Sequence, residues 1–430
     1  MSSAPQASAV RHGSFRLYLG AIVLGTLGIQ IQGVAVAWQV FRLTQADTKT
    51  AALALGAIGF AEVVPFVAAV LFAGHVADTH NRRRIAQWAL AAMSLLALVL
   101  LAQSLLRLEA WLQLALVYAT VTLGGLARSF LTTARQAMIA ELLPRELIAG
   151  GVRWRNTLFE LACVIGPGLA GLLLWLGGER LAYGLMLACF LASLTATSLL
   201  RTSQQLQTRT PEPIFRSLAA GIGFMRSQRV MLGAFTMDLF AVLLGGAVAL
   251  LPIFAQMLGV GEFGFGLLRA ATSMGAVLMS IYLIVRPPLE RAGPALYASF
   301  AVFGLSIIGF GLSIQLAGAL GLGLQAAFVL SFAFLFVSGA ADAVNVIIRQ
   351  TILQTTVPPE MMGRVSAVTA VFVGCSNELG MAESGLAARL LGTVNSVVFG
   401  GLATFGVMGL THWRFPEIWR LRKVGQEPVR

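Results

Sequence analysis

Charged residues, cysteine and histidine are all scarce in this sequence. Asp, Glu, Lys and Arg together make up 11% of the 430 residues, and there are three cysteines and four histidines. Soluble domains carry about 25% charged residues, so the composition excludes an ordinary water-soluble protein. Cys163, Cys189 and Cys375 all lie within apolar runs. They form no disulfide framework and no metal-ligand spacing, so we expect neither a metal nor another cofactor.

Other sequence patterns are missing as well. There is no succession of alternating segments about ten residues long, as a membrane β-barrel requires. The net charge is +12, but the basic residues, 28 of which are Arg, fall in short gaps between apolar runs. Such a distribution does not indicate a nucleic-acid partner. No Walker loop, H-E-x-x-H or suitably placed G-x-S-x-G is found, so we do not expect an enzyme.

What the sequence does contain is long apolar runs. Hydrophobic residues make up 57% of the chain, and the mean hydropathy is +0.83. Runs of about 20 residues or more can cross a bilayer core as helices. This predicts an all-α polytopic membrane protein with twelve transmembrane helices. The helices are expected at 15–41, 51–73, 85–106, 111–137, 150–177, 180–200, 231–258, 264–285, 294–315, 320–347, 365–391 and 393–412.

One long polar gap divides the spans into two groups of six. We expect an N-terminal bundle at 1–200, a cytoplasmic linker at 201–230, a C-terminal bundle at 231–412 and a cytoplasmic tail at 413–430. Apolar residues recur at helical spacing in the linker, with arginines between them. This favours an amphipathic helix on the membrane surface over the alternative, a disordered linker.

The basic residues also predict the orientation. With the N-terminus inside, 23 Lys and Arg fall on the cytoplasmic side and five on the outer side. Because cytoplasmic loops are enriched in Lys and Arg, both termini should be cytoplasmic.

The two groups of six helices are copies. ARQAMIAELLPRE at 134–146 returns as IRQTILQTTVPPE at 348–360, an offset of 214, and Gly33 corresponds to Gly246 at an offset of 213. A six-plus-six duplication is the pattern of a large class of secondary transporters. An ion channel is the alternative from another class, which we consider less well supported.

The loop after the second span, GHVADTHNRRR at 74–84, resembles the signature loop of the major facilitator superfamily, G-x-x-x-D-[RK]-x-G-[RK]-[RK]. Gly74, Asp78, Arg82 and Arg83 are in register, whereas Thr79 and Asn81 depart from the pattern. In the second half Pro288 stands at the position of the acid, so that half lacks an intact copy.

The fifth span carries VIGPGLAG, which is similar to an element typical of antiporters in this superfamily. Gly166, Pro167 and Gly171 match it, and Ala162 and Ala170 replace two of its glycines. Together with PxEMMGRVSA and ILQTTVPPE, the chain resembles the exporter branch of transmembrane secretion effector permeases, which includes the enterobactin exporter. The resemblance implies the major facilitator fold, with two pseudo-symmetric six-helix bundles.

The resemblance also implies a conformational lock formed by Gly74, Asp78, Arg82 and Arg83. Asp78 and the arginines would engage the eleventh helix when the cytoplasmic side is closed. The alternative is that the arginines only hold the loop inside. A metal at His75, Asp78 and His80 is disfavoured, because two surface histidines without a clear third ligand are usually solvated.

Ionisable side chains within spans are costly and are therefore candidates for function. Arg128 corresponds to Asp342 at the repeat offset of 214, which suggests a gate between the two bundles. The alternative is that each residue pairs within its own bundle, for example Arg128 with Glu160. For proton coupling the candidates are Glu62, Asp238 and Glu378, each of which could instead be a structural carboxylate.

Substrate contact is expected from polar and aromatic side chains of the first span. These are Gln30, Gln32 and Trp38, although Trp38 could also be a membrane anchor.

The sequence therefore predicts a secondary active transporter that works by alternating access. We expect proton-coupled efflux of a small siderophore-like or drug-like molecule, and the alternatives are an uptake symporter for a metabolite, an ion channel or a membrane-embedded enzyme. The expected location is the bacterial inner membrane. The expected partners are substrate, protons and membrane lipid, and the expected state is a monomer.

Overall fold

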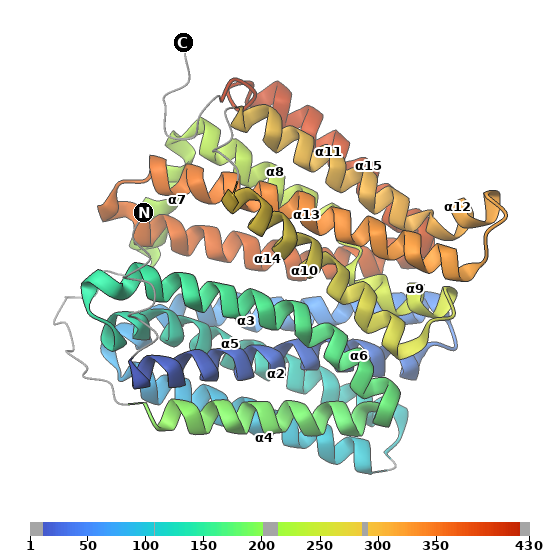
Figure 1. Cartoon of the computed structure of the whole chain (residues 1–430), viewed down its shortest axis with the longest axis horizontal. Helices are drawn as coiled ribbons and strands as arrows, with labels where there is room; N and C mark the ends of the chain where they lie inside the picture. Colours follow the sequence, from blue (N-terminus) through green and yellow to red (C-terminus); the bar gives the residue numbers. More distant parts are fainter. Residues whose placement is uncertain (1–11, 107, 201–213, 286–290, 422–430) are drawn as a thin grey trace. The chain divides into compact units, whose positions relative to one another are not determined.

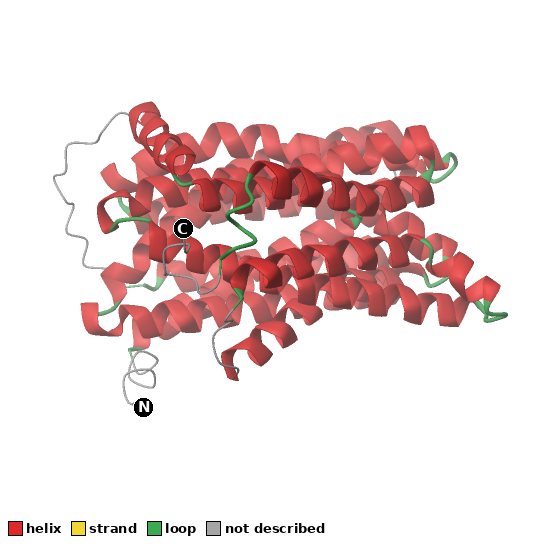
Figure 2. Ribbon diagram, turned by 90° about the horizontal axis from the view of Figure 1, so that it is seen from above, coloured by secondary structure: helices red, strands yellow, loops and turns green. Residues whose placement is uncertain are grey.

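A computed structural model describes residues 12–106, 108–200, 214–285 and 291–421. Within those ranges the chain is helical and contains no strand (Figure 2). Eleven of the described helices are long and apolar enough to cross a membrane. One of them is a double span, so the described part of the chain supplies twelve crossings, and the predicted polytopic all-α fold is confirmed.

The described residues up to 200 form five helices, α2 to α6, which Figure 1 labels. The fifth, α6, has 54 residues, which at 1.5 Å per residue is about 80 Å, more than twice the thickness of a bilayer core. Gly178 has φ 64° and ψ −160° and interrupts the helix, which is therefore two successive spans. The helices are α2 (Gly13–Thr44), α3 (Thr48–Thr79), α4 (Arg82–Leu105), α5 (Ala110–Leu142) and α6 (Arg145–Ser198).

The second half begins with the helix predicted for the linker. This helix, α7, packs against α14, where a Cβ added to Gly221 would lie 2.8 Å from the carbonyl oxygen of Arg364. The next span is built from α8, a short 3-10 turn and α9, with Gly246 at the break. The elements are α7 (Ile214–Ser227), α8 (Arg229–Gly245), η1 (Val248–Leu250), α9 (Leu251–Met257), α10 (Gly261–Val285), α11 (Ala292–Gly311), α12 (Ser313–Ala319), α13 (Leu324–Thr356), α14 (Pro359–Leu391) and α15 (Thr393–Arg414).

Contacts divide the chain into two compact units. Unit 1 comprises residues 1–43 and 61–212, and unit 2 comprises residues 44–60 and 213–430. The first part of α3 is grouped with unit 2 because Gly56 and Gly59 pack against the backbone of α14, at Gly385 and at the Glu378 carbonyl. The rest of α3 belongs to unit 1. A single helix thus contributes to both units, although the sequence predicts a boundary only at the linker.

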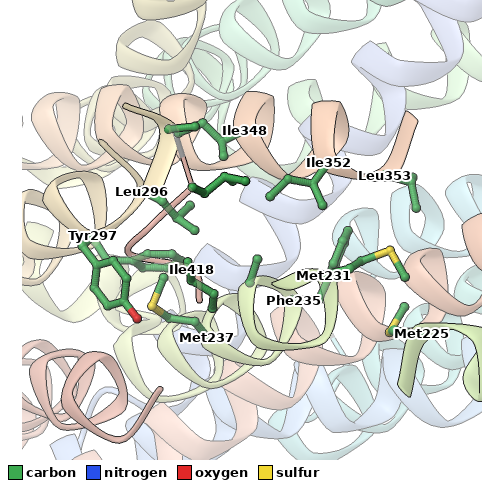
Figure 3. Close-up of a cluster of buried hydrophobic side chains, with 14 of the residues drawn as sticks. Met225, Met231, Phe235, Met237, Leu296, Tyr297, Ile348, Ile352, Leu353 and Ile418 are labelled. Carbon is green, nitrogen blue, oxygen red and sulfur yellow. The ribbon is translucent and has the colours of Figure 1, made fainter. Parts of the chain in front are cut away.

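Unit 2 has a core of methionine, aromatic and aliphatic side chains near one end of its helices (Figure 3). Met231 and Phe235 come from α8 and Leu296 and Tyr297 from α11, and α7, α13, α14 and the segment after α15 also contribute. The segment after α15 completes this core, because Ile418 is fully buried and the Leu421 carbonyl accepts a hydrogen bond from the Gly293 amide at 2.9 Å. The described part of the expected tail is therefore packed into unit 2.

Candidate functional site

Charged side chains inside apolar helices are the best indication of function in this fold. The described residues hold two such ion pairs, one in each unit. In unit 2 Arg349 pairs with Asp238, and in unit 1 Arg128 pairs with Glu62.

The Asp238 site is formed by facing positions of α8 and α13. Arg349 Nη1 donates to Asp238 Oδ2 at 2.5 Å, and Asn345 Nδ2 donates to Asp238 Oδ1 at 3.0 Å. Asn345 and Arg349 are four residues apart, so they lie on one face of α13. Arg349 Nε donates to Asn345 Oδ1 at 3.0 Å and thereby closes a three-residue ring. Asp238 is only 3% exposed, so this carboxylate depends on its partners rather than on water.

A second carboxylate adjoins this ring. Asp342 lies one turn before Asn345 on α13, and both side chains line a narrow cavity with Ser299 of α11. Asp342 is within electrostatic range of both Asp238 and Arg349. We call Asp238, Asp342, Asn345 and Arg349 the acidic cluster. When both acids are ionised the cluster carries two negative charges and one positive charge, and a single proton makes it neutral.

The unit 1 pair joins α3 to α5. Arg128 Nη1 lies 2.6 Å from Glu62 Oε1, and the guanidinium carbon lies 5.9 Å from the centre of the Phe66 ring. Gly125, nearly one turn before Arg128, allows the two helices to approach, because a Cβ there would lie 3.0 Å from the Glu62 carbonyl oxygen. Both side chains are partly exposed, unlike those of Asp238 and Arg349.

This pairing bears on the predicted gate between Arg128 and Asp342. Arg128 has Glu62 as an ion-pair partner within unit 1, in place of the Glu160 considered as an alternative. Asp342 has its own neighbours within unit 2. A bridge between the two residues in another state of the transport cycle stays a prediction.

Charge reversals can separate the two partners of Arg128. Arg128→Glu should lower the thermal unfolding midpoint, because it places two carboxylates together. Loss of the Glu62–Arg128 ion pair should lower the free energy of unfolding by about 1–3 kcal/mol. Adding Glu62→Arg should raise the midpoint again, since it restores one charge of each sign at these two positions. The Arg128→Glu/Asp342→Arg double variant should leave the midpoint low, because Glu62 still faces the new carboxylate. A Glu62/Arg128 swap no more stable than its single variants would contradict the pairing.

The two halves differ at the position of the acid. Arg135 is the repeat counterpart of Arg349, and Gly25 precedes Asp238 by 213 positions, the offset of Gly33 and Gly246. A Cβ on Gly25 would lie 2.5 Å from Arg135 Nη2, so the two positions are also adjacent in unit 1. The second half therefore has a carboxylate where the first half has a glycine.

Uncharged groups take the place of the acid in unit 1. Arg135 Nη2 donates to the Ala21 carbonyl at 2.9 Å and to Ser193 Oγ at 2.8 Å, and Tyr18 donates to the Arg135 carbonyl. The arginine is thus common to both halves, and the acid is specific to the second. A requirement of packing alone does not explain this asymmetry, since the same fold accommodates the arginine without an acid.

The predicted lock is only partly described. The side chains of Gly74 and Asp78 lie outside the described residues. Arg82 Nη1 donates to Glu141 Oε1 at 3.1 Å and to the Ala137 carbonyl of α5, and Arg83 donates to the Ser198 carbonyl at the end of α6. These two arginines therefore join the start of α4 to α5 and α6 within unit 1. No spacing rule in the sequence connects Glu141 with Arg82, so this partner is not predictable from the sequence.

The antiporter-type element has a packing role in unit 1. A Cβ on Gly166 would lie 2.5 Å from Cβ of Gln30, so this glycine brings α6 close to α2. Pro167 lies inside α6 beside it, and Gly171 is buried one turn later. The element thus lies against one of the predicted substrate-contacting residues.

The remaining predicted positions are distributed over both units. Gln32 lies within reach of Gly124 on α5, and Trp38 is 9% exposed and contacts Phe41. Trp38 is thus an interior residue, which argues against the membrane-anchor alternative. Glu378 lies on α14, where its main chain contacts Gly59. Among the described residues no three His, Cys, Asp or Glu converge as a metal site would require.

A family model and individual proteins match almost the whole chain. The model described as transmembrane secretion effector matches residues 4–421. The enterobactin exporter EntS of Shigella flexneri is 26% identical over 404 residues, covering 92% of this chain and 91% of the relative. The proteins of the same name from Escherichia coli, such as that of strain HS, are also 26% identical, over 401 residues.

Solved structures show the same fold at low identity. A D-xylose–proton symporter matches with a TM-score of 0.70 and 12% identity, over 95% of this chain and 98% of its own. A bacterial homologue of the iron transporter ferroportin, in an inward-facing state, matches with a TM-score of 0.68 and 14% identity, over 95% and 99%.

Proposed function

Because the chain belongs to the transmembrane secretion effector family of the major facilitator superfamily, we propose that it exports a small siderophore-like molecule in exchange for protons. The protein is a multi-pass membrane transporter. Its curated relatives are named enterobactin exporters, which supports the outward direction and a substrate of siderophore type. Rocker-switch alternating access is the mechanism that this fold accommodates.

The acidic cluster is the observation that supports proton coupling. A coupling group must exist in a charged and a neutral form during the cycle. Two carboxylates that share one guanidinium in an apolar interior meet this requirement, because one proton removes the surplus charge. The Glu62–Arg128 pair has one charge of each sign, so in isolation it has no such surplus. We therefore assign the coupled proton to the cluster and a structural or gating role to Glu62.

The proposed cycle follows from this charge balance. A proton that enters from outside, where it is more concentrated, neutralises the cluster and weakens the Arg349–Asp238 attraction. Return to the cytoplasmic side releases the proton, and the ring of Asp238, Asn345 and Arg349 closes again. The transporter reorients once toward the cytoplasm and once toward the outside in each cycle. Export of substrate is driven if one charge state of the cluster permits the first reorientation and the other charge state permits the second. Gln30 and Gln32 are the proposed substrate-contacting residues.

The proposed setting is the bacterial inner membrane, with both termini in the cytoplasm and a monomer as the working unit. The excess of Lys and Arg on the side of the termini supports this orientation. The start of α4, with Arg82 and Arg83, then lies on the cytoplasmic side, as expected for a lock of this family.

Everted membrane vesicles that contain a pH-sensitive dye test the proposal. We would energise the vesicles and add catechol siderophores, lipophilic cations and common antibiotics in turn. A substrate that is exported in exchange for protons should cause protons to leave the vesicle lumen. Vesicles without the protein control for leakage of the compounds themselves. Proton movement in the same direction as the substrate would indicate a symporter, and no response to a compound that the purified protein binds would indicate uncoupled transport.

A further inference from the structure

A long apolar groove lies on unit 1. It has a volume of about 670 Å³ and runs between α4 and α5, with the end of α3 at one edge. Aliphatic and aromatic side chains line most of it. They include Trp88, Leu95 and Leu96 on α4 and Leu123 and Phe130 on α5.

The groove opens toward the surroundings of the helices. Trp88 is 78% exposed, Leu95 62% and Leu123 53%. In a membrane protein such apolar surface faces hydrocarbon, because water would make this exposure unfavourable. The groove is therefore accessible from the lipid phase.

Only one end of the groove is polar. His80, Asn81 and Arg84 lie there, at the start of α4, and no acidic residue is among the described residues that line the groove. The three consecutive arginines differ in their partners. Arg82 and Arg83 are held by α5 and α6, whereas the exposed Arg84 guanidinium has no partner in the part of the chain that the structure describes. A cation without a partner among the described residues thus marks the end of an otherwise apolar groove.

The length of the groove matches one leaflet. From Arg84 to Leu96 the helix rises about 18 Å, and half of a typical hydrocarbon core is about 15 Å. In the proposed orientation Arg84 lies at the cytoplasmic interface, where anionic headgroups are found. An acyl chain that starts at this depth would end near the middle of the bilayer, at the level of Leu96, the last residue of α4 that lines the groove.

We propose that this groove binds one acyl chain of an anionic phospholipid from the cytoplasmic leaflet, with Arg84 on the phosphate. The charge of Arg84, with no acid among the described lining residues, favours an anionic over a zwitterionic lipid. The amide of Arg84 is already used, since it donates to Asn81 Oδ1 at 3.1 Å, so the side chain supplies the headgroup contact. The bound lipid would bridge α3, α4 and α5 beside the lock residues. The proposal uses only the orientation from the proposed function and does not depend on the substrate or on proton coupling.

Quenching of Trp88 by brominated lipid tests this assignment. The full-length protein would be placed in phosphatidylcholine vesicles that contain a minor fraction of phosphatidylglycerol or phosphatidylcholine with dibrominated acyl chains. The difference between the wild-type protein and Trp88→Phe isolates the Trp88 signal from the other six tryptophans. Brominated phosphatidylglycerol should quench Trp88 at about fivefold lower mole fraction than brominated phosphatidylcholine, as expected for one basic residue at an anionic headgroup.

Two arginine variants make the test specific. Arg84→Gln should abolish the preference for the anionic lipid, whereas Arg226→Gln, at an exposed arginine of α7, should retain it. Equal quenching by the two lipids, or a preference that survives Arg84→Gln, would overturn the proposal in favour of ordinary boundary lipid. Bromododecane that quenches as well as the anionic lipid would also overturn it, because the groove would then accept any apolar solute. None of these outcomes depends on transport activity.

Discussion

Replacing Asp238 by Asn is expected to abolish proton release in the vesicle assay, at least tenfold below the wild-type level, while the protein remains folded. The amide has nearly the size of the carboxylate and can still accept a hydrogen bond from Arg349. Asp342 remains nearby, so the cluster then holds one negative and one positive charge at every step. A cluster that is already balanced has no reason to take up a proton, and substrate binding should persist without coupling.

The partner variants separate this explanation from simple destabilisation. Asp342→Asn also leaves one acid and one arginine, so it should lose coupling while retaining a wild-type unfolding midpoint. Arg349→Met leaves two buried acids without a cation, which should cost about 3–5 kcal/mol of stability. The unfolding midpoint, substrate binding to purified protein and proton release would be measured for all three. Proton release by Asp238→Asn near the wild-type level would exclude the cluster as the coupling site without excluding export.

The second large effect is expected from Gly339 on α13. A Cβ at this position would collide with the carbonyl oxygen of Thr272 on α10, and a Cβ on Gly275 would collide with the carbonyl oxygen of Phe336 on α13. The two backbones are therefore in direct contact, as in other membrane helix pairs joined by small residues. Backbone atoms cannot move aside as a flexible side chain can. Gly339→Val should force the helices apart and cost about 3 kcal/mol or more.

Gly406 on α15 provides the matched control. It is also a helical glycine, but a Cβ there would meet no atom within 4 Å. Gly406→Val should therefore give a wild-type yield of monodisperse protein in size-exclusion chromatography, whereas Gly339→Val should give little or none. Equal yields would show that α10 and α13 can separate without loss of the fold, and the close contact would then be unimportant for stability.

The sequence alone was sufficient for most of the fold. The bilayer fixes the length of each span, so runs of apolar residues reveal helices even without alternating patterns. Twelve spans, the amphipathic linker helix and the internal duplication all follow from the linear pattern. The break at Gly178 between two spans was also expected, since the apolar stretch is too long for one crossing.

The candidate site was predictable only in part. Ionisable residues inside spans are rare, so Glu62, Arg128, Asp238 and Asp342 could be identified without a structure. Their partners could not. Arg349 lies in the repeated segment 348–360, and nothing in the sequence connects it with Asp238, which lies 111 positions earlier. Likewise, the repeat offset suggested Asp342 for Arg128, whereas unit 1 itself provides Glu62.

The sequence by itself determined which segments cross the membrane and which of them carry charge, because both depend on the cost of moving each residue from water into hydrocarbon. Tertiary structure alone decided which charges meet. A helix presents a side chain on a known face, but the neighbour on that face is set by how glycines such as Gly25, Gly125 and Gly166 let other helices approach. Two acids consequently share one arginine in unit 2, while the equivalent arginine of unit 1 lies over a glycine.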